Sequence, residues 1–107
     1  MRTPVLLSAA LLLLAACSSP SPGFSTVTPR EAVVDGSRFR IYLRPGTGEV
    51  EAHRVSFEPL PSLALTLEKA YRAIEQGTGC RIRKGSLRGD QAVILAQVDC
   101  PPLPADG

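Results

Sequence analysis

Between residues 30 and 57, alternating apolar and polar positions predict three β-strands, over 31–34, 37–43 and 49–57. The alternation is clearest in the second strand, which sorts Phe39, Ile41 and Leu43 onto one face and Arg38, Arg40 and Tyr42 onto the other. The third strand is less cleanly sorted: His53, Val55 and Phe57 share one face, and Ala52, Arg54 and Ser56 share the other. Asp35-Gly36 is a strong signal for a two-residue turn, so the first two strands are expected to form a hairpin.

A helix is expected next, because prolines at 59 and 61 end the third strand and apolar residues then recur every three or four positions. Ser62 is the expected N-cap, since its side-chain oxygen can accept a hydrogen bond from an N–H group of the first turn. The apolar stripe expected to face the sheet contains Leu63, Leu67, Ala70, Tyr71 and Ile74. Gly77 and Gly79 are expected to end the helix.

The last part of the chain predicts a hairpin of two strands, over 80–84 and 92–100, joined by a loop that contains glycines. A hairpin that is symmetric about Asp90 places Cys80 opposite Cys100, Arg81 opposite Asp99 and Ile82 opposite Val98. In this register the cysteines meet, Arg81 and Asp99 form an opposite-charge pair, and the apolar residues share one face. Leu87 is expected at the exposed tip of the loop, where it would serve as a contact point.

The first 29 residues have a different pattern. An apolar run follows Arg2 and ends in the small residues Ala15 and Ala16, which is the layout of a signal peptide. The run is about a dozen residues long, whereas a membrane-spanning helix needs about 20. Residues 17–29 are rich in serine, proline and threonine. They predict a disordered or extended tether with a reach of up to about 37 Å.

Leu14-Ala15-Ala16-Cys17 resembles the lipobox of bacterial lipoproteins. The resemblance implies that lipid is attached to the sulfur of Cys17, that residues 1–16 are removed, and that the mature chain is anchored to a membrane of the cell envelope and faces the periplasm. Ser18 resembles the pattern of outer-membrane rather than inner-membrane lipoproteins. Residues 73–100 are similar to small uncharacterised lipoproteins of Gram-negative bacteria, a resemblance that implies no activity. The alternative is an ordinary cleaved signal peptide with a chance cysteine after it.

With Cys17 assigned to lipid, Cys80 and Cys100 remain as an even pair in an oxidising compartment, which favours a disulfide. This disulfide would close a loop of about 20 residues and stabilise the fold by about 3 kcal/mol. The expected fold is α+β, an antiparallel sheet of four to five strands with one helix packed on one face, clipped by the disulfide. The expected boundaries are the signal peptide over 1–16, the lipidated cysteine and tether over 17–29, one domain over 30–101 and a loose tail over 102–107.

Composition and charge exclude several function classes. The chain of 107 residues has a formal net charge of only +2 and no tryptophan, so nucleic acid is not expected as a partner. His53 is the only histidine, so neither a metal site nor any cofactor other than the lipid on Cys17 is expected. No catalytic residues are assigned, because His53 has no nucleophile motif near it and G-x-S-x-G is absent. A buried cleft that held His53 next to a carboxylate would favour a small enzyme instead.

Two functions therefore remain after composition is considered. The first is a non-enzymatic accessory module of the cell envelope, which binds a partner protein. The second is a binding module for an anionic envelope component, either a cell-wall polymer or a lipid headgroup, through a basic surface made of Arg38, Arg40, Arg81 and Arg83. The alternative for these arginines is a solvated outer face, where long side chains cover apolar surface.

Overall fold

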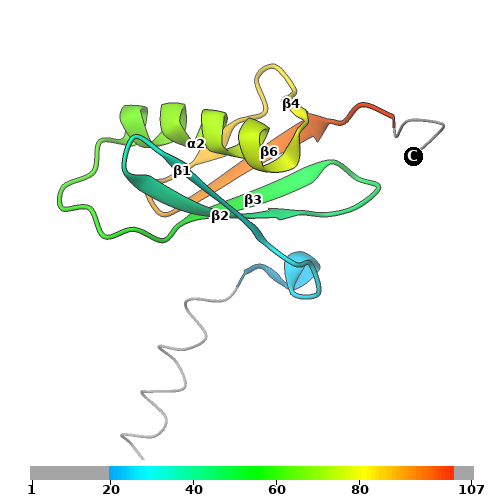
Figure 1. Ribbon diagram of the computed structural model, residues 1–107, viewed down its shortest axis with the longest axis horizontal. Coiled ribbons are helices and arrows are strands. Elements are labelled where there is room, and N and C mark those ends of the chain that lie inside the picture. Colours follow the sequence, from blue (N-terminus) through cyan, green and yellow to red (C-terminus); the bar gives the residue numbers. More distant parts are fainter. Residues whose placement is uncertain (1–19, 103–107) are drawn as a thin grey trace, which may run out of the picture.

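The computed structural model describes residues 20–102 of the chain. In this part, an antiparallel sheet curls beneath one long helix, α2, which lies along one of its faces (Figure 1). In chain order the elements are η1 (Pro22–Phe24), β1 (Arg30–Val34), β2 (Ser37–Leu43), β3 (Glu49–Arg54), α2 (Leu63–Thr78), β4 (Arg81–Ile82), β5 (Arg88–Gly89) and β6 (Val93–Asp99). The α+β prediction is confirmed, with six strands among the described residues where four to five were expected.

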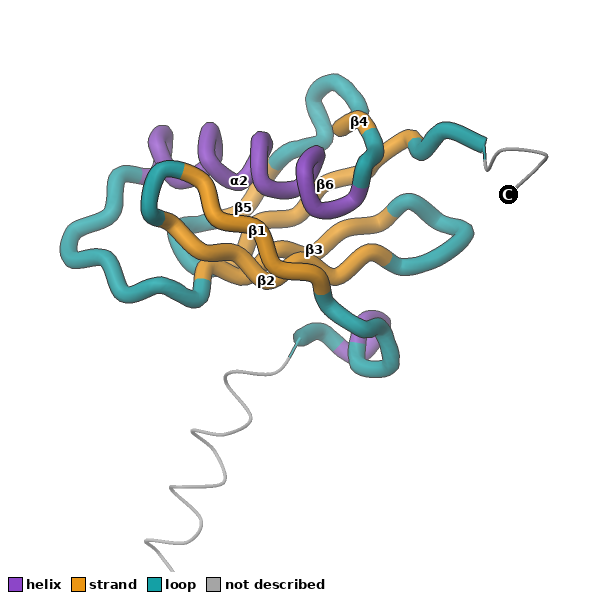
Figure 2. Tube along the Cα trace, in the orientation of Figure 1, coloured by secondary structure: helices purple, strands orange, loops and turns teal. Residues whose placement is uncertain are grey.

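The sheet has the strand order β1-β2-β3-β6-β4, and every pair of neighbours is antiparallel (Figure 2). The short strand β5 also pairs with β6. The β1–β2 hairpin turns through Asp35 and Gly36, both at positive φ (47° and 83°), which is the conformation that an Asp-Gly turn provides. The helix follows β3 and crosses one face of the sheet. The chain then forms β4 and β5 before β6, which pairs with β3 on one side and with β4 on the other.

The core lies between α2 and the sheet. Its largest fully buried apolar side chains are Phe39, Ile41, Val50, Ile74 and Ile94. Ser62 caps the helix as predicted, because its Oγ accepts a hydrogen bond from the Leu65 N–H at 3.3 Å. Gly79 ends it in the left-handed conformation (φ 71°) and donates its N–H to the Glu75 carbonyl.

The predicted buried stripe of the helix is partly wrong. Leu63 and Tyr71 are 42% and 41% exposed, whereas Thr66 and Ala73 are buried beside Ala70 and Ile74. The helix approaches the sheet through small side chains, and at Gly77 a Cβ atom would lie 2.7 Å from Ile41 Cδ1. Close approach through small residues, rather than burial of the largest ones, therefore sets the rotation of the helix.

The C-terminal hairpin has the predicted register. Arg81 lies opposite Asp99, Ile82 lies opposite Val98, and a disulfide joins Cys80 to Cys100 with their Cα atoms 4.4 Å apart. The expected ion pair is wrong in its partner, because Asp99 binds Arg83 at 2.6 Å and not Arg81. Leu87 is not an exposed tip, since it packs against the core where the loop turns back beside β6.

The third strand ends earlier than predicted, at Arg54 instead of Phe57. Val55 still donates its N–H to the Arg38 carbonyl at 2.8 Å. One step further, however, the Arg38 N–H is satisfied by the Ser56 hydroxyl and not by a backbone carbonyl. The side-chain bond replaces the strand ladder, and the chain leaves the sheet as a loop.

The beginning of the described chain also differs from the extended tether expected there. Phe24 is buried, with the Arg44 guanidinium 4.9 Å from the centre of its ring. Arg44 also donates to the Gly23 carbonyl at 3.1 Å, and Ser21 donates its N–H to Glu51 at 3.0 Å. An aromatic side chain that gains burial and a cationic partner outweighs the tendency of a serine- and proline-rich segment to remain extended.

The predictions for Cys17, for the signal peptide over 1–16 and for residues 103–107 of the tail lie outside the described residues. No helix in residues 20–102 is long and apolar enough to span a membrane.

Candidate functional site

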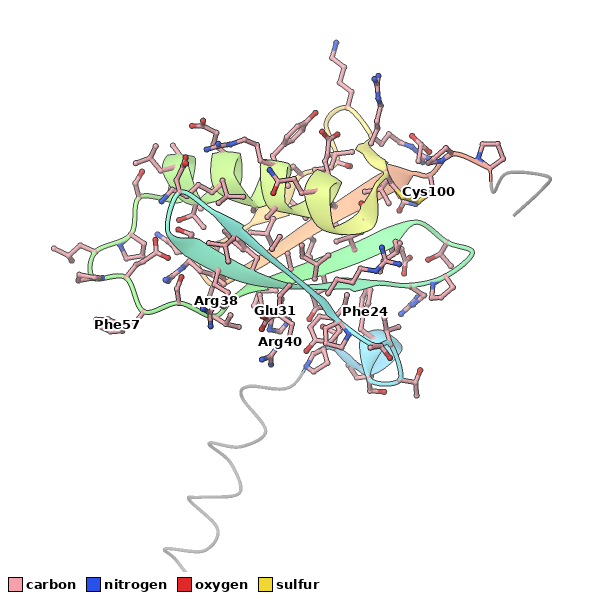
Figure 3. All side chains as sticks on the ribbon, viewed as in Figure 1. Phe24, Glu31, Arg38, Arg40, Phe57 and Cys100 are labelled. Carbon is pink, nitrogen blue, oxygen red and sulfur yellow. A yellow bond between two sulfur atoms is a disulfide. The ribbon has the colours of Figure 1, made fainter. Side chains whose placement is uncertain are left out.

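The face of the sheet opposite α2, here called the open face, carries most of the polar chemistry. Alternation along the strands places Phe39 and Ile41 against the helix and turns their neighbours in sequence the other way. The side chains of the open face are Glu31, Val33, Arg38, Arg40, Tyr42, Glu49, Glu51, His53, Val93, Leu95 and Gln97. Figure 3 labels Glu31, Arg38 and Arg40 on this side of the sheet, together with Phe24 and Phe57.

Glu51 is a buried carboxylate on the open face, with only 2% of its surface exposed. Its Oε1 lies 2.7 Å from His53 Nε2 and accepts the Ser21 N–H at 3.0 Å. The His53 ring in turn meets the Tyr42 ring edge-on, with centroids 5.4 Å apart. Burial works to raise the pKa of Glu51, but the hydrogen bonds from His53 and Ser21 outweigh it and hold the pKa below its ordinary value. Glu51 thus attaches the start of the described chain to the sheet as a carboxylate.

His53 therefore does lie next to a carboxylate, which is half of the arrangement that would favour an enzyme. The surrounding space is a hollow of about 250 Å³ lined by Arg40, Tyr42, His53, Arg54, Val55, Ala92 and Val93. Within the described part of the chain, this lining contains no serine, threonine or cysteine to act as a nucleophile. The bond between His53 and Glu51 accordingly has a visible structural use, which is to hold a buried acid that anchors Ser21.

The structure does not bring the four candidate arginines together. Arg38 and Arg40 are exposed on β2, and among residues 20–102 neither forms an ion pair. Arg81 and Arg83 lie at the β4 edge of the sheet, three strands from β2. Along β6, Arg83 is level with Gln97, four residues beyond the position that is level with Arg40, so the two pairs of arginines are about 20 Å apart. Hydrogen bonds between Arg83 and Asp99 also lower the pKa of that carboxyl group, so Arg83 is already engaged.

Exposed apolar side chains also belong to this surface, and the alternation of the strands did not predict their exposure. Val33 is the register partner of Arg38 and is 58% exposed. Val55, bonded to Arg38 from the other side, is 41% exposed, and Phe57 is 93% exposed. Leu60, further along the same loop, is 97% exposed and has a positive φ of 49°. The available signal was the run Pro59-Leu60-Pro61, because a leucine between two prolines fits neither a strand interior nor a helix interior.

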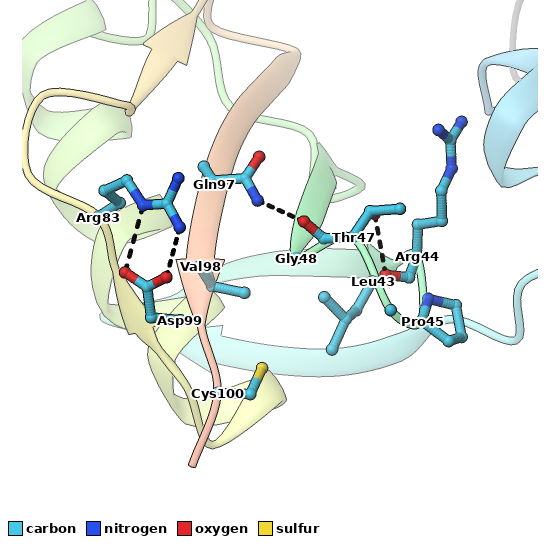
Figure 4. Close-up of a pocket in the computed structure, with 11 residues that line it drawn as sticks. Leu43, Arg44, Pro45, Thr47, Gly48, Arg83, Gln97, Val98, Asp99 and Cys100 are labelled. Carbon is cyan, nitrogen blue, oxygen red and sulfur yellow. Dashed lines mark hydrogen bonds and ion pairs between the residues drawn. The ribbon is translucent and has the colours of Figure 1, made fainter. Parts of the chain in front are cut away.

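Another hollow with a polar lining lies at the opposite end of the sheet (Figure 4). It has a volume of about 340 Å³ and lies between the β2–β3 turn and the disulfide-linked edge. Its polar groups satisfy one another: Arg83 binds Asp99, and the Gln97 side chain donates to the Thr47 carbonyl. A ligand there would have to displace these bonds, so the hollow is a weaker candidate than the open face.

Metal chemistry has no visible site in this part of the molecule. Among residues 20–102, no three His, Cys, Asp or Glu side chains are grouped so that they could hold a metal ion. Comparisons with protein-family models, with curated proteins and with solved structures found no match to the chain. The functional argument therefore depends on the residues and geometry of the chain itself.

Proposed function

We propose that the chain is a lipid-anchored protein of the bacterial cell envelope that serves as a non-enzymatic accessory module facing the periplasm. The observation that carries the proposal is the disulfide between Cys80 and Cys100. It accounts for two of the three cysteines and leaves Cys17, at the end of the lipobox-like sequence, as the odd one. A disulfide is also typical of an oxidising compartment such as the periplasm.

The chemistry of the anchor explains why the odd residue is a cysteine. A thiol forms a stable thioether with lipid, and each buried CH₂ group of an acyl chain adds about 0.8 kcal/mol of membrane affinity. One chain binds a membrane only marginally, whereas two or three hold a protein there for long periods. Ser18, directly after the cysteine, resembles the pattern of outer-membrane lipoproteins, so the outer membrane is the proposed destination.

The accessory role is favoured over catalysis by the use that the fold makes of its one histidine. His53 is engaged with Glu51 and Tyr42, and that pair holds the chain near Ser21 in place. An enzyme would need a nucleophile or a bound cofactor beside this pair. The hollow next to His53 offers arginine, tyrosine and aliphatic groups instead.

A second candidate function is binding of an anionic envelope component, and it is favoured by the two exposed arginines of β2. Arg38 and Arg40 project from the open face without carboxylate partners among the described ion pairs. Two cations on an exposed sheet face can attract phosphate or carboxylate groups at low ionic strength. The site is smaller than the four-arginine surface expected from the sequence, because Arg81 and Arg83 lie elsewhere.

The anchor is tested by fractionating cells that express the full chain or its Cys17→Ala variant. The wild-type protein is expected in the membrane fraction, with a mass at Cys17 raised by lipid, and the variant is expected in the soluble periplasmic fraction. Ser19→Ala is the matched control, because it alters the neighbouring sequence and leaves the thiol. A Cys17→Ala protein that stays in the membrane fraction would contradict the proposal.

A further inference from the structure

The distance between the anchor and the sheet is short, given the lipid anchor proposed above. Ser21 is bonded to Glu51 on the open face, and Phe24 is buried three residues later. Only three residues lie between Cys17 and Ser21, and the four steps from one to the other span at most about 14 Å when the chain is fully extended. A domain held this closely cannot stand far from the bilayer, so one of its faces lies against the membrane.

The open face is the one that the short link brings to the membrane. The chain reaches the domain on this face, because Glu51 belongs to it and Ser21 binds Glu51. The opposite face is covered by α2. Figure 3 shows Arg38, Arg40, Phe24 and Phe57 on the side of the sheet away from α2.

The residues of this face suit a lipid surface. Arg38 is flanked by Val33 on β1 and by Val55 on the other side, and both valines are exposed. Phe57, which is 93% exposed, lies at the same end of the face and has lost the strand pairing that could have covered it. Exposed apolar side chains around cations are what interfacial membrane contact requires. Glu31 is the register partner of Arg40, and Glu51 on the next strand is buried and bonded to His53 and Ser21. The exposed charges at this end of the face are therefore those of two arginines and one glutamate.

We propose that the open face binds the surface of the bilayer that carries the anchor, with Arg38 and Arg40 on lipid phosphates and Phe57 in the boundary between headgroups and acyl chains. The lipid anchor supplies most of the affinity, and the open face fixes the orientation of the domain. In this orientation α2 points away from the membrane, and the exposed Tyr71 on the helix remains in water.

The chain has no tryptophan, so a single substitution gives an unambiguous fluorescent probe. Full-length Phe57→Trp protein is reconstituted into vesicles of phosphatidylethanolamine and phosphatidylglycerol whose acyl chains carry bromine. Tyr71→Trp is the matched control, because it places the probe at an exposed aromatic position on α2. Fluorescence at position 57 should fall strongly, because side chains at an interface enter about 5–10 Å into the boundary with the acyl chains. Fluorescence at position 71 should not change. Equal quenching at both positions, or none at position 57, would overturn the proposal.

The electrostatic part is tested with Arg38→Gln and Arg40→Gln, and with Arg81→Gln as a control at the distant edge of the sheet. Each of the first two changes should weaken the quenching-detected contact with the anionic vesicles about fivefold, since a basic residue near an anionic surface contributes about that factor. Arg81→Gln should have no effect. Inorganic phosphate at millimolar concentration should not reverse the contact, because the lipid surface binds and not the free anion. Reversal of the contact by phosphate would contradict binding to a lipid surface. Absent quenching in vesicles, together with crosslinking of residue 57 to a protein in cells, would also contradict it.

Failure of this inference can be separated from failure of the anchor. The mass at Cys17 reports the anchor alone. If Cys17 carries no lipid, the full chain can be coupled through the Cys17 thiol to a maleimide lipid in the same vesicles, and the two tryptophan positions still report which face meets the bilayer. Quenching confined to position 57 would then support the membrane-contact surface even though the proposed function had failed.

Discussion

Removal of the disulfide should destabilise the domain strongly, because few other contacts hold its last strand pair. The bond links positions 20 residues apart, and the chain-entropy model gives about 3 kcal/mol for a loop of that length. Strand β4 contributes only Arg81 and Ile82 to the sheet. A domain of this size is stable by about 5–10 kcal/mol in total. The melting temperature should therefore fall by about 12–24 °C on reduction.

The measurement is a thermal melt followed by circular dichroism, made on the Cys17→Ala chain so that Cys80 and Cys100 are the only cysteines. Melts with and without a phosphine reductant are compared with those of the Cys80→Ala/Cys100→Ala variant, which should match the reduced protein. Arg83→Gln is the matched control, because it breaks the other side-chain link between the same two segments. That ion pair is more than half exposed on both sides, so its loss should lower the melting temperature far less than reduction of the disulfide does. A fall of less than about 4 °C on reduction would refute the reasoning.

Two further predictions concern buried groups. Glu51→Gln should cost about 1–2 kcal/mol at pH 7 and less at pH 3, measured by urea unfolding. The direction of this pH dependence follows from the lowered pKa of Glu51. The carboxylate adds to the free energy of unfolding above the ordinary pKa of a glutamate, and this contribution is lost as the pH falls through the pKa of Glu51 in the folded protein. An equal cost at both pH values would contradict it. Gly77→Ala should cost about 1 kcal/mol despite its better helix propensity, because its Cβ would lie 2.7 Å from Ile41 Cδ1. In an Ile41→Val background, which removes that methyl group, the same change should instead be neutral or stabilising.

Features that depend on neighbouring residues in the chain were predictable from the sequence. The Asp35-Gly36 turn, the Ser62 cap and the alternation of β2 each follow from local geometry, and all three are present in the fold. The register of the C-terminal hairpin was also predictable, because a slip by one residue would move its cysteines and its apolar side chains to the wrong face. The partner of Asp99 was not predictable, since a long arginine two residues further along the strand reaches the same carboxylate.

Features that depend on distant segments could not be read from the pattern. The buried face of α2 follows from the close approach at Gly77 and Ala73, which depends on the shape of β2 as well as on the small residues of the helix. Glu51 occupies a polar position of an alternating strand, and its burial comes from the segment that binds it 30 residues earlier in the chain. No local pattern contains both partners, so a buried carboxylate was indistinguishable from a solvated one.

The loop after β3 shows how a wrong boundary can still indicate the correct face. Alternation through His53, Val55 and Phe57 predicted that these three side chains share one face, and the structure shows Phe57 on the side of the open face. The prediction failed because a strand needs a partner as well as a pattern: β6 begins at Val93, opposite His53, and the Arg38 N–H turns to the Ser56 hydroxyl. Without a neighbouring strand, Phe57 lies on the side that the alternation predicted, but its side chain remains 93% exposed. The packing of the domain does not account for an apolar side chain exposed in this position, on the face that Ser21 binds, whereas the lipid contact proposed above does.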